Sequence, residues 1–132
     1  MVEFHGWAVI RWNDALPGIE QQLAAIRRAV EIARSDFSIA EMSTPGNDLT
    51  VVYVHGLRNH RASGIHQLFE SVAHHAPESY GLLYVSDQED PGTDNAFRVW
   101  RLARGQFSEM ADPFLSPRVP TIEARYDARQ EH

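Results

Sequence analysis

Three histidines offer the broadest chemistry in this sequence, because a neutral imidazole can bind a metal ion or transfer a proton near neutral pH. His55 and His60 stand on either side of Gly56, and His5 lies in the first apolar stretch of the chain. A metal site needs three or four converging ligands, and the sequence contains neither HExxH nor a comparable ligand spacing. We therefore interpret the histidines mainly as structural or surface residues. His5, His55 and His60 remain candidates for a small metal-dependent or histidine-based hydrolase.

Four carboxylates form the second group with chemical potential, at Asp87, Glu89, Asp90 and Asp94. Such a group could hold a hard cation or present negative charge to a basic protein surface. Their spacing does not follow the calcium-binding loop pattern, which favours a solvated loop over a cation site. As a contact surface for a protein partner, this loop is the best candidate in the chain.

A third polar group follows Gly56, where Arg58, His60 and Arg61 come after an apolar stretch. Arginine side chains there would suit a phosphate or a carboxylate. The 12 basic residues, all of them arginine, are outnumbered by 18 acidic residues, and the formal net charge of -6 opposes binding to a nucleic-acid backbone. We therefore expect no nucleic-acid partner, and we treat Arg58, His60 and Arg61 as a second candidate surface for a protein.

The sequence offers no complete nucleophilic site. The chain has no cysteine, which excludes thiol chemistry and disulfides. Ser63 and Ser86 lack the G-x-S-x-G pattern of a nucleophile elbow, and Ser63 is better placed to begin a helix. The residue types therefore point to no catalytic set and no cofactor.

Length and composition fit a single domain, because 132 residues with 43% hydrophobic content can bury one core. We expect that domain to cover residues 1–132, with an ordered core at about 3–122 and a frayed tail at 123–132. No apolar stretch approaches the ~20 residues that span a bilayer, and the N-terminus lacks the features of a signal peptide. The sequence thus predicts a cytoplasmic protein with no membrane partner.

Hydrophobic periodicity predicts two helices among several short strands. Apolar residues spaced by three and four predict the first helix, and Pro77 ends the second. We expect the polar residues from Gly56 to Arg61 to form a break between a strand and a helix. The predicted elements are, in order, strand Glu3–Trp12, a helix beginning near Pro17, strand Phe37–Met42, a strand from Leu49 to Val54, helix Ser63–Ala76, and strands Ser79–Asp87, Ala96–Leu102 and Gln106–Met110.

This order predicts an α+β fold, in which two helices pack on one face of a mostly antiparallel sheet of five to six strands, ferredoxin-like in its first six elements. Pro113, Pro117 and Pro120 oppose a helix or a central strand, so the C-terminal part should be an extended Pro-rich segment. We expect the three tryptophans mainly in the core, although one on an open sheet face would suit a protein partner.

Several blocks of the sequence, taken together and in this order, resemble the immunity protein 7 family of bacterial polymorphic toxin systems. The resemblance runs from about Glu3 to Thr121. The blocks are Phe4-His5-Gly6-Trp7, Gly56-Leu57-Arg58-Asn59-His60-Arg61, Tyr80-Gly81-Leu82-Leu83-Tyr84 with the acids that follow it, Phe97-Arg98-Val99, and Asp112-Pro113-Phe114-Leu115-Ser116-Pro117 with Pro120-Thr121.

This resemblance implies a cytosolic immunity protein that binds and neutralises a cognate toxin domain, without enzymatic activity of its own. Many such toxins are nucleases with basic clefts, so an acidic inhibitor would approach a nuclease quickly. The resemblance carries no set of contact residues, and the acidic loop and the Arg58 group remain our candidates from the residues alone. The alternatives are the histidine-based hydrolase and an oligomeric structural or regulatory domain. A homodimer is compatible with an immunity protein as well as with an oligomeric domain.

Overall fold

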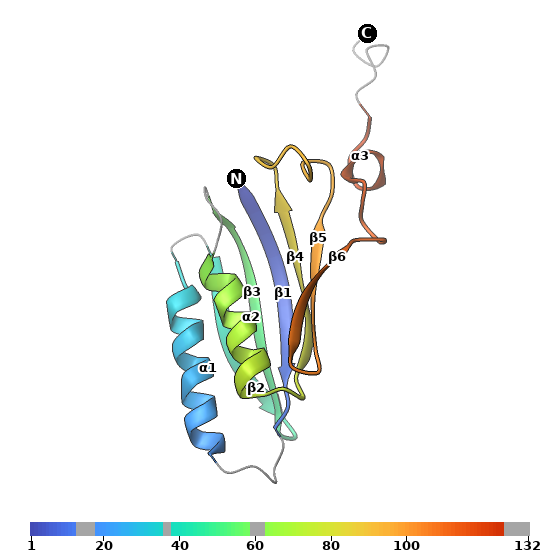
Figure 1. The fold of residues 1–132 in the computed structure, drawn as a ribbon. Coiled ribbons are helices and arrows are strands. Elements are labelled where there is room, and N and C mark those ends of the chain that lie inside the picture. Colours follow the sequence, from blue (N-terminus) through green and yellow to red (C-terminus); the bar gives the residue numbers. More distant parts are fainter. Residues whose placement is uncertain (13–17, 36–37, 59–62, 126–132) are drawn as a thin grey trace.

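In the computed structural model, the described residues are 1–12, 18–35, 38–58 and 63–125. They form one six-stranded antiparallel sheet in the order β2-β3-β1-β4-β5-β6, with two long helices on one face (Figure 1). The elements are β1 (Val2–Ile10), α1 (Ile19–Ala33), β2 (Ser38–Gly46), β3 (Leu49–Arg58), α2 (Ser63–His75), β4 (Tyr80–Asp87), β5 (Arg98–Ala103), β6 (Gln106–Ala111) and α3 (Arg118–Thr121). The predicted α+β fold, with a ferredoxin-like order from β1 to β4, is confirmed.

Strand β1 lies at the centre of the sheet, hydrogen-bonded to β3 on one side and to β4 on the other. Its alternating side chains divide cleanly between the two faces. Phe4 and Ala8 are buried under the helices, whereas His5 and Trp7 are exposed on the opposite face. The sheet therefore has a helix-covered face and an open face.

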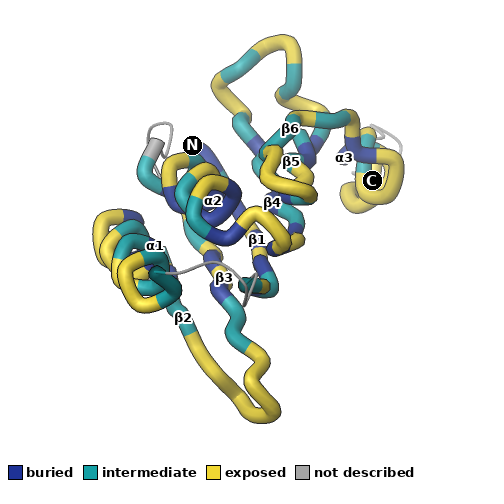
Figure 2. Tube along the Cα trace, turned by 60° about the horizontal axis from the view of Figure 1, so that its bottom comes forward, coloured by how far each residue is buried: buried dark blue, intermediate teal, exposed yellow. Residues whose placement is uncertain are grey.

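The core fills the space between the sheet and the two long helices. Figure 2 shows that buried residues are frequent in the central strands, whereas the end of the β2–β3 hairpin is exposed. The helices contribute the apolar stripes that the 3.6-residue period requires. The buried helical residues are Ile26, Val30 and Ala33 of α1, and Ile65, Leu68, Phe69, Val72 and Ala73 of α2.

Strand β3 corrects one prediction. The segment that begins at Gly56 was expected to be a polar break, but β3 continues through Gly56 and Leu57 to Arg58, paired with β1. A Cβ atom on Gly56 would stand 2.6 Å from the ring of Phe4 and 2.6 Å from the Cβ of Ser38. Gly56 is therefore needed for close packing of neighbouring strands, and it does not interrupt the strand.

The C-terminal segment contains no long helix, as its prolines predict. The element α3, Arg118–Thr121, is four residues long, and Val119 and Pro120 within it have non-helical backbone angles. Arg118 is buried there, with its guanidinium 5.0 Å from the centre of the Phe97 ring and donating to the hydroxyl of Ser86. These contacts attach the segment to β4 and to the start of β5.

Asp112 anchors the beginning of that segment. One carboxylate oxygen accepts hydrogen bonds from the Phe114 amide at 2.8 Å and the Tyr84 hydroxyl at 3.2 Å. The other accepts from the Leu115 amide at 3.0 Å and the Ser116 hydroxyl at 2.8 Å. Burial by itself would raise the pKa of Asp112, but these hydrogen bonds stabilise the carboxylate and lower the pKa below its usual value.

Candidate functional site

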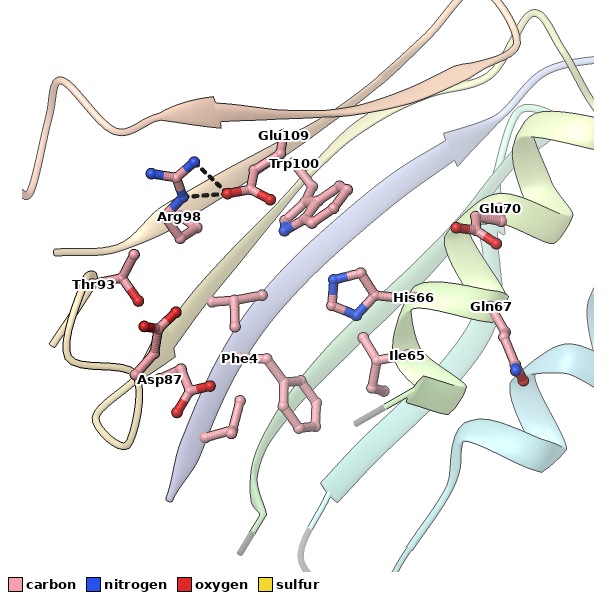
Figure 3. Close-up of a pocket in the computed structure, with 13 residues that line it drawn as sticks. Phe4, Ile65, His66, Gln67, Glu70, Asp87, Thr93, Arg98, Trp100 and Glu109 are labelled. Atoms are coloured by element: carbon pink, nitrogen blue, oxygen red, sulfur yellow. Dashed lines mark hydrogen bonds and ion pairs between the residues drawn. The ribbon is translucent and has the colours of Figure 1, made fainter. Parts of the chain in front are cut away.

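A pocket of about 450 Å³ opens on the helix-covered face, between the N-terminal half of α2 and strands β4 to β6 (Figure 3). It exists because two helices cannot cover six strands, and α2 is the last long helix over the sheet. We call it the acidic pocket. Its lining residues are Val2, Phe4, Ile65, His66, Gln67, Glu70, Val85, Asp87, Asp90, Thr93, Arg98, Trp100 and Glu109.

The floor and one wall of the acidic pocket are apolar. Phe4 and Ile65 are fully buried beneath it. Trp100 forms the wall on β5, where its ring meets the edge of His66 at 4.8 Å between centroids and stacks on Phe107 at 5.1 Å. Because Trp100 is held between two other rings, the wall is already formed before any partner arrives.

The charge of the acidic pocket is strongly negative. Among the described residues, its lining contains four carboxylates, from Glu70, Asp87, Asp90 and Glu109, and one guanidinium, from Arg98, which gives these residues a formal charge of -3 with His66 neutral. Arg98 is already engaged, since it forms an ion pair with Glu109 across β5 and β6.

The structure divides the four predicted loop acids between two positions. Asp87 and Asp90 line the acidic pocket, whereas Glu89 and Asp94 are exposed outside its lining. Glu89 forms an ion pair with the amino group of Met1 at 2.9 Å, which ties the loop to the start of β1. The loop is further ordered by its own acids, because Asp87 accepts a hydrogen bond from the Glu89 amide at 3.0 Å.

The second predicted group lies near the first. Arg58 ends β3 and pairs in register with Val2, and Asp87 pairs with Val2 from the other side of β1. Two strand spacings separate their backbones, which is roughly 10 Å. The two candidate groups thus meet at one end of the sheet through Arg58 and Asp87, while His60 and Arg61 lie outside the described residues.

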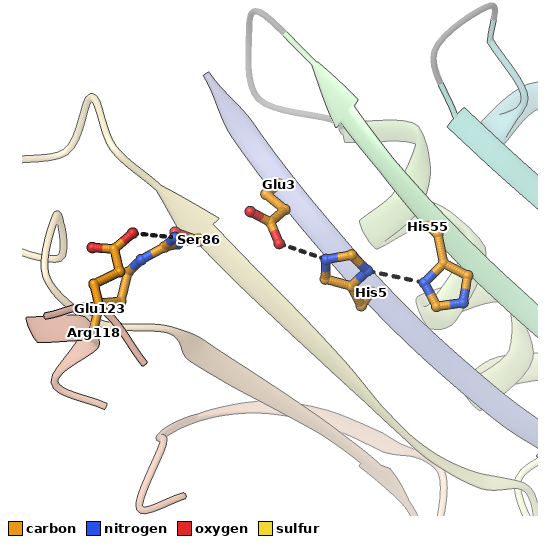
Figure 4. Close-up of polar contacts among 6 residues, drawn as sticks. All are labelled: Glu3, His5, His55, Ser86, Arg118 and Glu123. Carbon is orange, nitrogen blue, oxygen red and sulfur yellow. Dashed lines mark hydrogen bonds and ion pairs between the residues drawn. The ribbon is translucent and has the colours of Figure 1, made fainter. Parts of the chain in front are cut away.

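The histidine hypothesis concerns the open face. His5 and His55 are directly opposite each other on β1 and β3, with 2.9 Å between their Nδ1 atoms, and His5 Nε2 lies 2.6 Å from a carboxylate oxygen of Glu3 (Figure 4). His60, the third residue of that hypothesis, is outside the described residues. Among the residues that are described, no group of three or more histidine, aspartate or glutamate side chains could hold a metal ion.

Sequence reasoning missed the part of the pocket that comes from β5, β6 and α2. Arg98 and Trp100 alternate with Val99, and Glu109 lies opposite Trp100 on β6, so these large polar or amphipathic side chains share one face. A face with this composition is typical of a sheet surface that no helix covers. That signal was present in the sequence, but the order of the strands was needed to interpret it.

Comparison with known protein families identifies the family of this chain. A sequence model of the family described as immunity protein 7 matches residues 1–124. No curated protein and no solved structure matches the chain. Within the described part of the chain, no helix is long and apolar enough to cross a membrane.

Proposed function

Because the chain belongs to the immunity protein 7 family and is thus an immunity protein of a toxin system, we propose that it binds its cognate toxin domain through the acidic pocket and the loop beside it. Binding there would cover the working surface of the toxin and so protect the cell that produces both proteins. In this proposal the protein acts in the cytoplasm, needs no cofactor and transforms no substrate.

The observation that carries the proposal is the concentration of charge. Among the described residues, four carboxylates and one guanidinium line the pocket, and the exposed Asp94 extends the same sign along the neighbouring loop. An acidic surface of this kind steers a basic partner towards it and favours the correct orientation on encounter. A basic surface is what a nuclease domain uses to hold a phosphate backbone, so we propose a nuclease as the toxin.

Arg58, His60 and Arg61 form the second part of the proposed contact surface. Arg58 ends the strand next to β1, at the same end of the sheet as Asp87. The arginines of this group would pair with carboxylates of the toxin, and would oppose partners whose charges are arranged differently. This part of the surface would therefore contribute specificity more than rate.

Binding to a purified cognate toxin domain tests the proposal. The double variant Asp87→Asn with Asp90→Asn should slow association by about tenfold and flatten its dependence on salt, because both carboxylates contribute to steering. Glu78→Gln, an exposed acid after α2, is the matched control and should leave both quantities unchanged. If the wild type, the double variant and Glu78→Gln associate with the toxin at equal rates and with equal salt dependence, the acidic pocket is not part of the interface.

A further inference from the structure

We infer that a second copy of this chain covers the open face of the sheet, in a symmetric dimer whose two-fold axis runs parallel to β1 and passes over Trp7. The inference goes beyond the proposed function, because the acidic pocket lies on the helix-covered face and is left to the toxin in such a dimer. Three features of the open face support it: its apolar surface, the order of charges across it and the position of the C-terminal segment.

The open face carries large apolar side chains that neither long helix covers. Strands β1 to β4 all contribute to them, and Trp7 and Tyr53 are direct neighbours in register. Five of these side chains are between 36% and 52% exposed, namely Trp7, Ile39, Tyr53, Leu57 and Tyr80. A continuous apolar surface on a small domain is typical of a contact surface for a protein.

The open face has the size that a dimer needs. Its five strands from β2 to β5 lie about 4.8 Å apart, and the nine residues of β1 rise about 3.4 Å each, which gives a surface of roughly 700 Å². A standard interface buries about 800 Å² on each partner. Two sheets can pack face to face at a distance of about 10 Å, with their inner side chains interdigitated.

The charges across the open face are complementary to those of a second copy. One row of residues paired in register crosses the sheet from β2 to β5: Glu41, Tyr53, Trp7, Leu82 and Arg101. Glu41 and Arg101 each lie two strands from Trp7, about 10 Å away on opposite sides. A rotation of 180° about an axis along β1 therefore places Glu41 of each copy opposite Arg101 of the other, and Trp7 opposite its own counterpart.

Both charged residues at the ends of this row can be reached by a second copy. Arg101 is exposed, and the side chain of Glu41 is 44% exposed. Glu41 lies 2.8 Å from Arg34, but Arg34 also holds Glu31 at 2.7 Å. A carboxylate can accept several hydrogen bonds, so Glu41 can receive Arg101 of the other copy while it keeps its contact with Arg34.

The C-terminal segment fits the same rotation. Arg118 fastens it to Ser86 of β4 on the open face, on the same side of the sheet as the histidines (Figure 4). Ser86 and Leu57 are the two neighbours of Glu3 in register, one on each side of β1. The rotation thus brings the segment of one copy, with its exposed Phe114, over Leu57 of the other.

A shallow hollow lies at the place where that segment arrives. Its volume is about 610 Å³, and its lining includes Ile39, His55 and Leu57 of β2 and β3. Exposed apolar side chains of the segment on one half of the face therefore match an apolar hollow on the other half. A surface that complements itself in this way is the requirement for a two-fold dimer.

Sedimentation equilibrium of the full chain over a range of concentrations tests the dimer. The wild type should have twice the mass of one chain. Glu41→Arg and Arg101→Glu should each raise the dissociation constant of the dimer at least about tenfold, because like charges then face each other twice. An equimolar mixture of these two variants should regain the dimer, since every contact between Glu41→Arg and Arg101→Glu chains joins opposite charges.

Glu31→Arg is the matched control. It adds the same charge as Glu41→Arg and also removes a partner of Arg34, but it lies on α1 and should leave the dimer intact. Circular dichroism shows whether each variant is folded. A wild-type chain that is monomeric at every concentration, or a mixture of folded variants that stays monomeric, would overturn the inference.

Toxin binding separates this inference from the proposed function. Trp7→Asp should abolish the dimer, because two carboxylates then meet at the axis, and should bind the toxin as well as the wild type does. Loss of toxin binding by folded Trp7→Asp would show that the toxin itself occupies the open face, and would overturn the inference. If the wild type forms the dimer by the charge pairing above but binds no toxin, the dimer stands and the proposed function fails.

Discussion

Replacement of Asp112 is the sharpest test of how the C-terminal segment is held. Asp112 is 7% exposed and accepts four hydrogen bonds, two of them from the amides of Phe114 and Leu115. Asp112→Ala removes the acceptors and leaves the hydroxyls of Tyr84 and Ser116 without them. If this variant is destabilised, the Asp112–Pro117 block belongs to the family pattern because it holds the C-terminal segment in its fold.

The expected magnitude follows from the donors. Hydrogen bonds to a charged group contribute about 1.5–3 kcal/mol each when measured singly, and they do not add. Water can serve the amides of Phe114 and Leu115, because both residues are exposed. We therefore expect Asp112→Ala to lower the free energy of unfolding by about 3 kcal/mol, and Asp112→Asn, which keeps one acceptor oxygen, by about half as much.

The pH dependence gives an independent check on Asp112. The pKa of its carboxyl is lower in the folded protein than in the unfolded chain, so the stabilisation is complete above the unfolded value of about 4 and is lost as the pH falls through the folded value. The difference between wild type and Asp112→Asn should be constant from neutral pH down to about pH 5, and should shrink below about pH 4.

Urea unfolding monitored by circular dichroism measures both effects, with Glu78→Gln as an exposed control. Hydrogen exchange of the Phe114 and Leu115 amides should accelerate in Asp112→Ala, because their acceptor is gone. A loss below about 1 kcal/mol in Asp112→Ala, or a difference from Asp112→Asn that does not shrink in acid, would refute the argument from these hydrogen bonds.

Three further predictions concern the sheet, the core and one histidine. Gly81→Ala should prevent folding, because the added Cβ would stand 2.0 Å from a carbonyl oxygen of β1. Gly64→Ala in α2, with its nearest contacts at 3.6 Å, should be neutral or should raise the free energy of unfolding by up to about 1 kcal/mol in the same urea assay. Phe69→Ala should lower the free energy of unfolding by about 3–5 kcal/mol in urea, since the ring is fully buried, and a loss under about 1 kcal/mol would show that the site collapses. Burial, and to a smaller extent His74, lowers the pKa of His75, so its contribution to stability is present above the usual histidine pKa and is lost as the pH falls below that value. From pH 7 to pH 5, the free energy of unfolding should decline less in His75→Gln than in the wild type. An equal decline in both proteins would contradict this assignment.

Much of the fold could be predicted from the sequence because local periodicity and packing agree. Hydrophobic periodicity predicted the strand Glu3–Trp12 and the helix Ser63–Ala76, which correspond to β1 and α2. Asn47 and Asp48 lie between two predicted strands, Phe37–Met42 and Leu49–Val54, and both adopt the positive φ angles of a tight turn, 52° and 61°. These signals are local, so they survive without knowledge of the tertiary structure.

The candidate site could be predicted only in part, because it depends on which strands lie side by side. Asp87 and Asp90 were found from their density of charge, but nothing local shows that Trp100 and Glu109 face them. The polarity after Gly56 was interpreted as the end of a strand, whereas tight packing against Phe4 keeps that strand going to Arg58. Both differences come from contacts between segments that are far apart in the sequence.

The central claim is that this protein protects a cell by covering a toxin. The most direct measurement is survival of cells that express the cognate toxin domain, with and without this chain. We predict that cells survive with the intact chain and with Glu78→Gln, and that survival falls when Asp87 and Asp90 are both replaced. Death at the same rate with and without the intact chain would contradict the account.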